Sequence, residues 1–395
     1  MKNLSFERYS SKLNYIFIGK NAEKNIEIKK NNLVIIIKTF LIIIFSVFII
    51  YFIKINFNKN NLFKKFYSLS KKSIITKNID KEFLSKLKNI LNNDRIIENE
   101  IMKNHTTFKI GGPAKLFIIP KTITEIIEII KLCNKYKVYY FILGNGSNLL
   151  VSDKGYNGIV ILIHEINFSK FEVKKENEKI YTLSVGAGML MKTLSIEACL
   201  LSLTGLEDII DIPGTIGGGI IMNASFRKTG LQKPLIKVKV ITPEGKLLDL
   251  SKEECGLIHR GSMLKNKKYI VIEVIFKLEK GDQMTIQKTM TNNTKMRYDK
   301  QPMYFRSAGC FFVWDHSKHG SMHKKYKENN LVSYRVGNAM IYTYNIAFIV
   351  NLGNGTASQV MTIVKHIEKI MKKKYKIEIK REVVVIGSFN DIEYY

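Results

Sequence analysis

The chain has 395 residues and a mass of 45.6 kDa, which is long enough for two or three domains. Hydrophobic residues make up 46 % and charged residues 25 %, so a wholly disordered chain, a collagen and a polytopic membrane protein are excluded. The formal net charge is +29, a value that fits nucleic acid or an anionic membrane as partner. The basic residues are spread along the whole length without a patch, which favours solvated faces or an anionic small-molecule substrate and predicts no nucleic-acid partner.

Four cysteines are scattered along the chain without a Cys-x-x-Cys pair. This spacing argues against a disulfide scaffold and against a zinc ribbon, and it predicts a reducing compartment.

The N-terminal residues 1–78 differ from the rest. Residues 33–53 form an apolar run of 21 residues with a single charge, Lys38. At ~1.5 Å per residue, such a helix is long enough for a bilayer core of ~30 Å. We therefore expect a membrane-spanning or organelle-targeting segment, with a buried helix as the alternative. Basic residues flank the run on both sides, so the positive-inside rule predicts no orientation.

From about His105 onward, the pattern is that of an α+β enzyme. Thr122 with Glu125, and Thr356 with Gln359, form capping boxes that predict the first turns of two helices. Every second residue is apolar between 270 and 278, which predicts a strand with one buried face. In chain order we expect a strand at 115–120, a helix from 122, strands at 138–143 and 158–163, a helix at 189–203 ended by Gly205, a hairpin turn at 242–245, a strand at 269–278 and a last helix from 356.

Three glycine clusters lie beside strands, at 111–113, 144–148 and 214–219. Glycines allow backbone N–H groups to approach phosphate oxygens closely because no Cβ intervenes. None of the clusters is a Gly-x-Gly-x-x-Gly fingerprint or a P-loop, and each alone is equally typical of a turn. Three of them beside strands favour a cofactor that carries a diphosphate.

The order of the motifs is more specific than their composition. The chain carries, in this order, "NHTTFKIGGPAK", "LGNGSNLLVSDKGYNGIVI", "GLEDIIDIPGTIGGGIIMNAS", "SAGCFF", "YRVG", "FIVNLGNGTA" and "EVVVIG". This series resembles the UDP-N-acetylenolpyruvoylglucosamine reductase family over residues 98–389. The arrangement with a short C-terminal part resembles the type II branch, and the first hundred residues have no counterpart.

This resemblance implies a vanillyl-alcohol-oxidase/PCMH-type FAD-binding domain at 79–280 and a small α+β substrate domain at 281–395, after the N-terminal extension 1–78. It implies FAD as cofactor, NADPH as reductant and a UDP-sugar as the small-molecule substrate, whose enolpyruvyl ether is reduced to give UDP-N-acetylmuramate for peptidoglycan synthesis. The reaction is cytosolic in the family, so the catalytic part is expected on the cytoplasmic side. By motif match, the cofactor-binding residues are Ile110, Gly111, Gly112, Gly144, Asn145, Gly146, Ser147, Asn148, Ser152, Asp153, Ile159, Val160, Pro213, Gly214, Thr215, Gly217 and Gly218.

The same resemblance implies three catalytic residues. Arg260, in "HRGS", would pair with the substrate carboxylate, and Glu382 would help to polarise or protonate the intermediate. Cys310 stands where most relatives carry a proton-donating serine, and a thiol is the better acid of the two. Taken alone, these residues are equally typical of a surface arginine, a solvated carboxylate and a small buried side chain. Asn223 and Tyr334 are expected at the substrate.

The C-terminal third departs from the family pattern. Val313, Trp314 and Asp315 stand where Phe-Lys-x-Pro is usual, and two basic groups expected near the UDP-sugar are missing. If the chain has lost any part of the family's activity, we expect the loss to be in its affinity for the UDP-sugar substrate. The stretch 316–330 replaces a family helix; we interpret it as a polar loop and expect no metal on its histidines, because Gly320 interrupts their spacing.

Two other functions stay open at this point. One is a flavoprotein of the same fold with another substrate, and the other is a membrane-tethered homologue without turnover.

Overall fold

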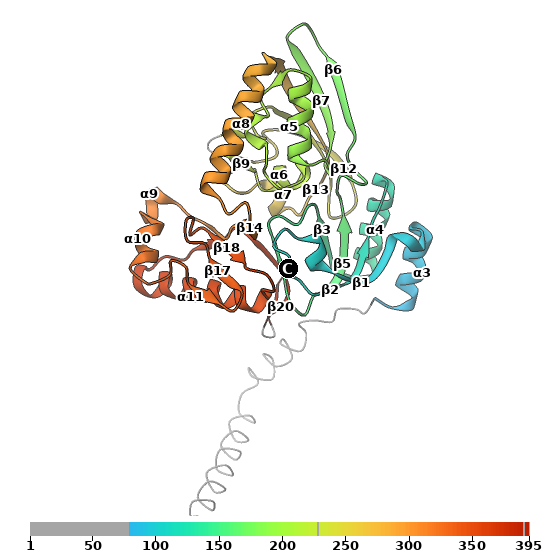
Figure 1. The fold of residues 1–395 in the computed structure, drawn as a ribbon. Helices are drawn as coiled ribbons and strands as arrows, with labels where there is room; N and C mark the ends of the chain where they lie inside the picture. The colour runs from blue at the N-terminus through green and yellow to red at the C-terminus, as the bar shows by residue number, and fades with distance from the viewer. Residues whose placement is uncertain (1–78, 227–228, 390–391, 395) are drawn as a thin grey trace, which may run out of the picture. The chain divides into compact units, whose positions relative to one another are not determined.

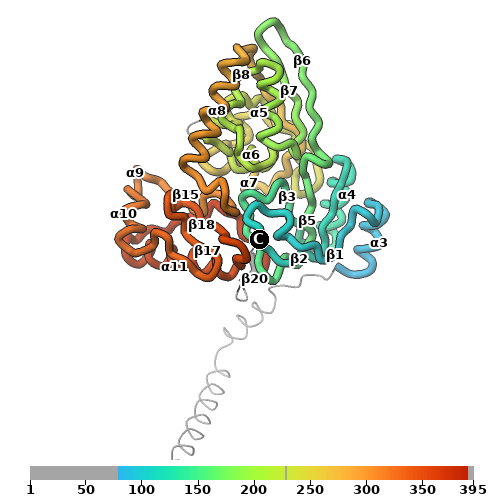
Figure 2. Tube along the Cα trace, viewed as in Figure 1, coloured from blue at the N-terminus to red at the C-terminus, as the bar shows by residue number. Residues whose placement is uncertain are grey.

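The structure is a computed structural model that describes residues 79–226, 229–389 and 392–394 (Figures 1 and 2). The segment 33–53, predicted to span a membrane or to direct targeting, lies outside these residues. Among the helices of the described part, none has the length and apolar character that crossing a membrane requires.

The first lobe is a four-stranded sheet in the order β1-β2-β5-β3, in which β2, β5 and β3 are parallel and β1 is an antiparallel edge. Helices α3 and α4 pack on one face of it, around the fully buried Leu87, Ile129 and Ile161. The elements of this lobe are α3 (Lys81–Ile90), η1 (Asn93–Arg95), β1 (Ile96–Ile101), η2 (Met102–His105), β2 (Pro113–Ile118), α4 (Ile123–Tyr136), β3 (Tyr140–Leu143), β4 (Leu149–Val151) and β5 (Tyr156–Leu162).

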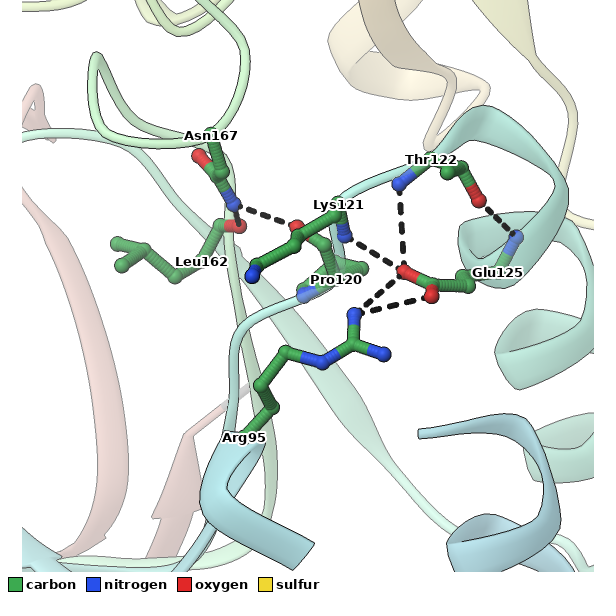
Figure 3. A network of polar contacts seen from close by, with 7 residues as sticks. All are labelled: Arg95, Pro120, Lys121, Thr122, Glu125, Leu162 and Asn167. Carbon is green, nitrogen blue, oxygen red and sulfur yellow. Dashed lines mark hydrogen bonds and ion pairs between the residues drawn. The ribbon is translucent and has the colours of Figure 1, made fainter. Parts of the chain in front are cut away.

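The start of α4 confirms the first predicted capping box (Figure 3). The Thr122 hydroxyl accepts the Glu125 N–H, and the Glu125 carboxylate accepts the N–H groups of Thr122 and Lys121. Both oxygens of Glu125 also bind Arg95 Nη1 at 2.9 Å. Burial raises the pKa of Glu125, but the backbone donors and Arg95 outweigh it, so the pKa lies below its ordinary value. The start of α4 is thereby fixed to the end of η1, directly before β1.

The second lobe is built on a sheet in the order β12-β11-β13-β7-β6, with β8 beside β13. Strand β13 confirms the predicted alternation, and the hairpin turn predicted at 242–245 joins β11 to β12. Helix α8 runs alongside α5 (Figure 2). The elements are β6 (Phe171–Lys175), β7 (Ile180–Gly186), α5 (Met191–Leu200), β8 (Leu203–Thr204), η3 (Glu207–Ile209), α6 (Ile216–Ile221), β9 (Ser225–Phe226), β10 (Thr229–Gly230), β11 (Leu235–Ile241), β12 (Leu247–Ser251), α7 (Met263–Asn266), β13 (Ile270–Lys280) and α8 (Gln283–Lys300).

The expected end of the helix before Gly205 was wrong. Helix α5 ends at Leu200, and Ser202, with φ 54°, takes a left-handed conformation just after it, three residues before Gly205. The chain can therefore form β8 before it reaches Gly205.

The third lobe packs helix α11 against the sheet β14-β18-β17-β16. The second predicted capping box, at Thr356 and Gln359, is confirmed. The elements are β14 (Arg306–Cys310), β15 (Phe312–Val313), α9 (His316–His319), α10 (Met322–Lys327), β16 (Arg335–Val336), β17 (Ala339–Ile341), β18 (Phe348–Asn351), α11 (Ala357–Tyr375), β19 (Lys380–Arg381), β20 (Val384–Phe389) and β21 (Ile392–Tyr394).

The interpretation of residues 316–330 as a loop was wrong, because α9 and α10 form there. The hydroxyl of Ser321 caps α10, and the side chains of Met322 and Tyr326, one helical turn apart, are buried in the core of the third lobe. Among the described residues, no group of three or more metal-binding side chains is assembled.

The third lobe is tied back to the first. Strand β20 pairs in parallel with β4, with Val384 opposite Leu149. The Asp153 carboxylate accepts the N–H groups of Ala357 and Ser358, at 2.7 and 2.8 Å, and so caps α11 across the same boundary. The end of the chain is therefore held against the loops that follow the strands of the first lobe.

Candidate active site

The structure brings the three predicted catalytic residues into one cluster. Arg260 Nε lies 3.5 Å from Glu382 Oε1, and the two side chains are 27 % and 14 % exposed. Arg260 lies between β12 and α7 with φ 57°, a left-handed conformation that is uncommon for a residue with a side chain. Its Nη1 donates to the carbonyl of Ser225 at 3.4 Å. The guanidinium is thus held between β9 and the carboxylate.

Backbone hydrogen bonds from two lobes position Glu382. Its N–H donates to the carbonyl of Phe311 at 2.9 Å, and its carbonyl accepts Nδ2 of Asn148 at 3.1 Å. Burial raises the pKa of the Glu382 carboxyl, and Arg260 and Lys265 oppose that shift without cancelling it. A carboxyl with a raised pKa is suited to taking up and releasing protons.

Cys310 ends β14 at an irregularity of the sheet. The register between β14 and β18 shifts after Ser307, and Gly309 takes φ 80°. Such a bulge redirects the side chain that follows it. Burial raises the pKa of the thiol to about 11; Glu382 acts in the same direction, whereas Arg260 and Arg297 oppose it. At neutral pH the sulfur therefore carries its proton, and both members of the ion pair lie within electrostatic reach of it.

Two cations of this cluster were missed by the sequence reasoning. Arg297, on α8, is 5 % exposed, and its guanidinium carbon lies 5.3 Å from the centre of the Phe226 ring. Lys265, on α7, places Nζ 3.4 Å from the sulfur of Met222; burial lowers its pKa, as does Lys380, and Glu382 opposes them. Lys265 closes the "HRGSMLK" stretch and could have been found there, whereas Arg297 is one cation on a polar helix and carried no signal.

The two predicted substrate residues fall in different places. Asn223 is 8 % exposed and donates to the carbonyl of Ile258, at 3.0 Å, in the loop that carries Arg260. Its Oδ1 is buried and has no partner among the described residues. Tyr334 instead stacks on His366 of α11, with ring centres 4.9 Å apart. Asn223 thus lies beside the cluster, and Tyr334 is anchored to α11.

The loop between β3 and β4 offers unused backbone donors. No hydrogen bond between described residues has the N–H of Asn145, Gly146, Ser147 or Asn148 as its donor. Gly146 takes φ 59°, and a Cβ there would lie 2.1 Å from the His105 carbonyl oxygen. Successive open N–H groups in a half-buried loop form a concavity that suits a phosphate oxygen. This loop therefore fits the diphosphate of the predicted cofactor.

The glycine cluster at 214–219 packs directly on this loop. A Cβ at Gly144 would lie 2.5 Å from Thr215 Oγ1, and one at Gly214 would lie 3.3 Å from Ser147 Oγ. The Thr215 hydroxyl accepts the N–H of Gly218 at 3.3 Å. The structure thus places the clusters at 144–148 and 214–219 side by side.

Other predicted cofactor residues have structural partners. The N–H of Gly112 donates to the Ser152 carbonyl at 2.8 Å, and the Ser152 hydroxyl donates to the carbonyl of Ser388 on β20. Ile110 packs in the core of the third lobe. Ile159 is fully buried under α3 and α4 with its N–H bonded to Tyr139, so its side chain is not brought to the glycine loops. The cofactor roles of these residues stay predictions.

The comparisons with known proteins agree with this arrangement. Residues 114–251 match the FAD binding domain family. The fold and the site together define a flavoprotein oxidoreductase, with FAD as its cofactor, and the predicted α+β class with a PCMH-type FAD domain and a C-terminal domain is confirmed.

The C-terminal part narrows this class. Residues 301–386 match the family "UDP-N-acetylenolpyruvoylglucosamine reductase, C-terminal domain". Proteins named UDP-N-acetylenolpyruvoylglucosamine reductase from Lachnoclostridium phytofermentans and Alkaliphilus metalliredigens are each 36 % identical, over 77 % and 78 % of this chain and 97 % and 98 % of their own. The crystal structure of that reductase (MurB) from Thermus caldophilus is 32 % identical, with a TM-score of 0.60 over 72 % of this chain and 97 % of its own. The chain belongs to the UDP-N-acetylenolpyruvoylglucosamine reductase family.

The resemblance drawn from the motifs is thereby confirmed, together with the expected enzyme class, the peptidoglycan reaction and the use of FAD and NADPH. The UDP-sugar substrate is confirmed as the small-molecule partner. The residue roles, the domain boundaries and the membrane association stay predictions.

Proposed function

We propose that Arg260, Glu382 and Cys310 handle the carboxylate and the proton in the reduction of the enolpyruvyl UDP-sugar to UDP-N-acetylmuramate. One observation carries the proposal. Three residues that are distant in sequence and come from three separate segments meet in one half-buried cluster, in which a protonated thiol lies within electrostatic reach of a 3.5 Å ion pair. The cluster adjoins the loop with open amides, because Asn148 of that loop binds the backbone of Glu382.

When bound, FAD would supply hydride-transfer chemistry with NADPH as the reductant, and the open N–H groups of residues 145–148 would hold its diphosphate. The residues of this chain would manage the charge and the proton. Arg260 presents a permanently charged, forked donor to the substrate carboxylate, where negative charge builds up. Cys310 holds a proton on sulfur at neutral pH and donates it to the carbon beside that carboxylate. Burial raises the pKa of the Glu382 carboxyl. This carboxyl polarises the same end of the substrate and orients Arg260.

Cys310→Ala tests the proposal in the FAD-loaded chain. Reduction by NADPH alone should proceed at the wild-type rate, because it does not use the thiol. Turnover that depends on the enolpyruvyl UDP-sugar should fall by about 100-fold, the usual effect of a lost general acid. Cys199→Ala is the matched control, since Cys199 is a buried thiol on α5, outside the cluster. Unchanged turnover in Cys310→Ala would remove this residue from the chemistry.

We also propose that residues 33–53 attach the chain to a membrane or direct it to an organelle, and the apolar run of 21 residues supports this. Fractionation of the full chain against a version that begins at residue 79 tests the proposal. Equal recovery of both in the aqueous fraction would contradict the membrane attachment.

A further inference from the structure

Arg297 is a buried cation for which the proposed mechanism has no role. Its side chain is 5 % exposed, and its Nε is buried without a hydrogen-bond partner among the described residues. The carboxylate that faces it, Asp211, is already engaged: it accepts the Thr294 hydroxyl at 2.6 Å and pairs with Lys192 at 3.1 Å. A buried N–H donor without a partner is costly, so packing alone is a weak explanation of Arg297.

The surroundings of Arg297 connect it to the catalytic cluster. Its guanidinium lies over the ring of Phe226, and the preceding residue, Ser225, accepts a hydrogen bond from Arg260. The charged or titratable groups that act on Arg297 are Asp211, Cys310 and Arg260, and those that act on Cys310 are Glu382, Arg260 and Arg297. Arg260 and Arg297 thus contact neighbouring residues of β9, Ser225 and Phe226, and two guanidinium groups held close together favour an anion beside them.

We propose that Arg297 is a positioning residue for the proton donor: together with Arg260 it balances the negative charge that stays on the Cys310 sulfur after proton transfer. The inference rests on the proposed role of Cys310. In the step concerned, the S–H bond of Cys310 breaks and its electron pair remains on sulfur. The proton forms a C–H bond with the electron pair of the carbon beside the carboxylate, which became electron-rich when hydride reached its neighbour. Water then returns a proton to the thiolate.

The ring of Phe226 suits this arrangement. An aromatic face attracts a guanidinium but carries no formal charge, so it orients Arg297 without neutralising it. The charge stays available for the sulfur, whereas a carboxylate in the same place would cancel it.

Thiol alkylation tests the inference without relying on turnover. The full-length, FAD-loaded chain is treated with iodoacetamide, a neutral reagent that neither arginine attracts, at one mildly alkaline pH. Mass spectrometry then follows the modification of Cys310, and the other three cysteines, which are buried, serve as internal references. The rate reports the thiolate fraction, because the thiolate is the nucleophile.

We expect Arg297→Gln to slow the alkylation of Cys310 by about tenfold, the effect of removing one opposite charge near a titrating group. Arg297→Lys should restore most of the rate because it keeps the charge. Lys295→Gln, an exposed position on the same helix, should leave the rate unchanged.

An unchanged rate in Arg297→Gln, or an equally slow rate in Arg297→Lys, would overturn the inference. So would a rise in KM for the UDP-sugar with no change in alkylation, since Arg297 would then bind substrate. If Cys310→Ala keeps full turnover while Arg297→Gln slows alkylation, the donor role fails and the link between Arg297 and the sulfur stands.

Discussion

Replacing Glu382 by Gln should separate activity from stability. The carboxylate lies 3.5 Å from Arg260 Nε, so its gross attraction at an effective dielectric constant of ~20 is about 5 kcal/mol. Burial removes a comparable amount, because desolvation costs several kcal/mol for each ion. The raised pKa shows that burial outweighs the attraction. Arg260 is 27 % exposed and keeps its hydrogen bond to Ser225, so Glu382→Gln does not leave it as a fully buried, unpaired charge. We therefore expect the free energy of unfolding at neutral pH to change by no more than about 1 kcal/mol, while kcat falls by about 100-fold.

The sign of the pH dependence follows from the same shift. The pKa of Glu382 in the folded chain lies above its ordinary value of 4.5, so the folded state binds this proton more tightly than the unfolded state. The resulting stability is present below that ordinary value and is lost as the pH rises through the folded pKa. Between pH 4.5 and neutrality, Glu382→Gln should therefore gain stability relative to the wild type. Urea titrations at several pH values measure this difference.

A neighbouring pair provides the control. Glu368 accepts Arg381 Nε at 2.6 Å and Nη2 at 2.9 Å, with side chains 28 % and 23 % exposed, and it lies outside the cluster. Glu368→Gln should cost about 1 kcal/mol of stability and leave kcat unchanged. If Glu382→Gln instead unfolds the chain and keeps kcat per folded molecule, Glu382 is a structural residue and the reasoning is wrong.

Three further outcomes follow from the loops and caps. Gly146→Ala should abolish the visible flavin absorbance of the purified chain, because a Cβ would lie 2.1 Å from a carbonyl oxygen. Gly320 has a similar φ but open space around it, so the control Gly320→Ala should lower the free energy of unfolding by about 1 kcal/mol and retain the flavin. Asp153→Asn should lower the free energy of unfolding by about 1–2 kcal/mol, measured in urea, because two N–H groups of α11 lose a charged acceptor; Asp282→Asn, at the exposed start of α8, should cost less. Asn148→Ala should lower kcat several-fold with the flavin still bound, because it removes the side-chain amide that holds the Glu382 carbonyl and keeps the backbone N–H of the loop.

The parts of the fold that were predicted correctly depend on local chemistry. The capping boxes at Thr122 and Thr356 involve residues three positions apart, and the alternation in β13 needs only a strand with one buried face. The helix α10 was missed although Met322 and Tyr326 have helical spacing, because the stretch 316–330 replaces a family helix with polar residues and was interpreted as a loop. A helix as short as α10 has only two buried side chains. Two apolar residues are too few to form a periodic pattern that can be recognised in a polar sequence.

The candidate site could be predicted only where a family motif supplied the position. Arg260, Glu382 and Cys310 have no pattern in common, and their meeting depends on contacts between distant segments, such as the pairing of β20 with β4. Arg297 stands out only because it is buried. Whether a residue of the polar helix α8 is buried depends on the helix and strand packed against it, and the sequence of α8 does not show this.

These contacts make the cofactor loop and the catalytic carboxylate parts of one structural unit. Asn148 belongs to the loop with open amides, and it binds Glu382 through its side chain and Val384 through its carbonyl, at 3.1 and 3.0 Å. Asp153, five residues later, caps the long helix of the third lobe. A displacement of the third lobe would therefore move Glu382 away from Arg260, which belongs to the second lobe, and disturb the loop at the same time. We infer that docking of the third lobe and the chemistry of the site depend on the same few hydrogen bonds.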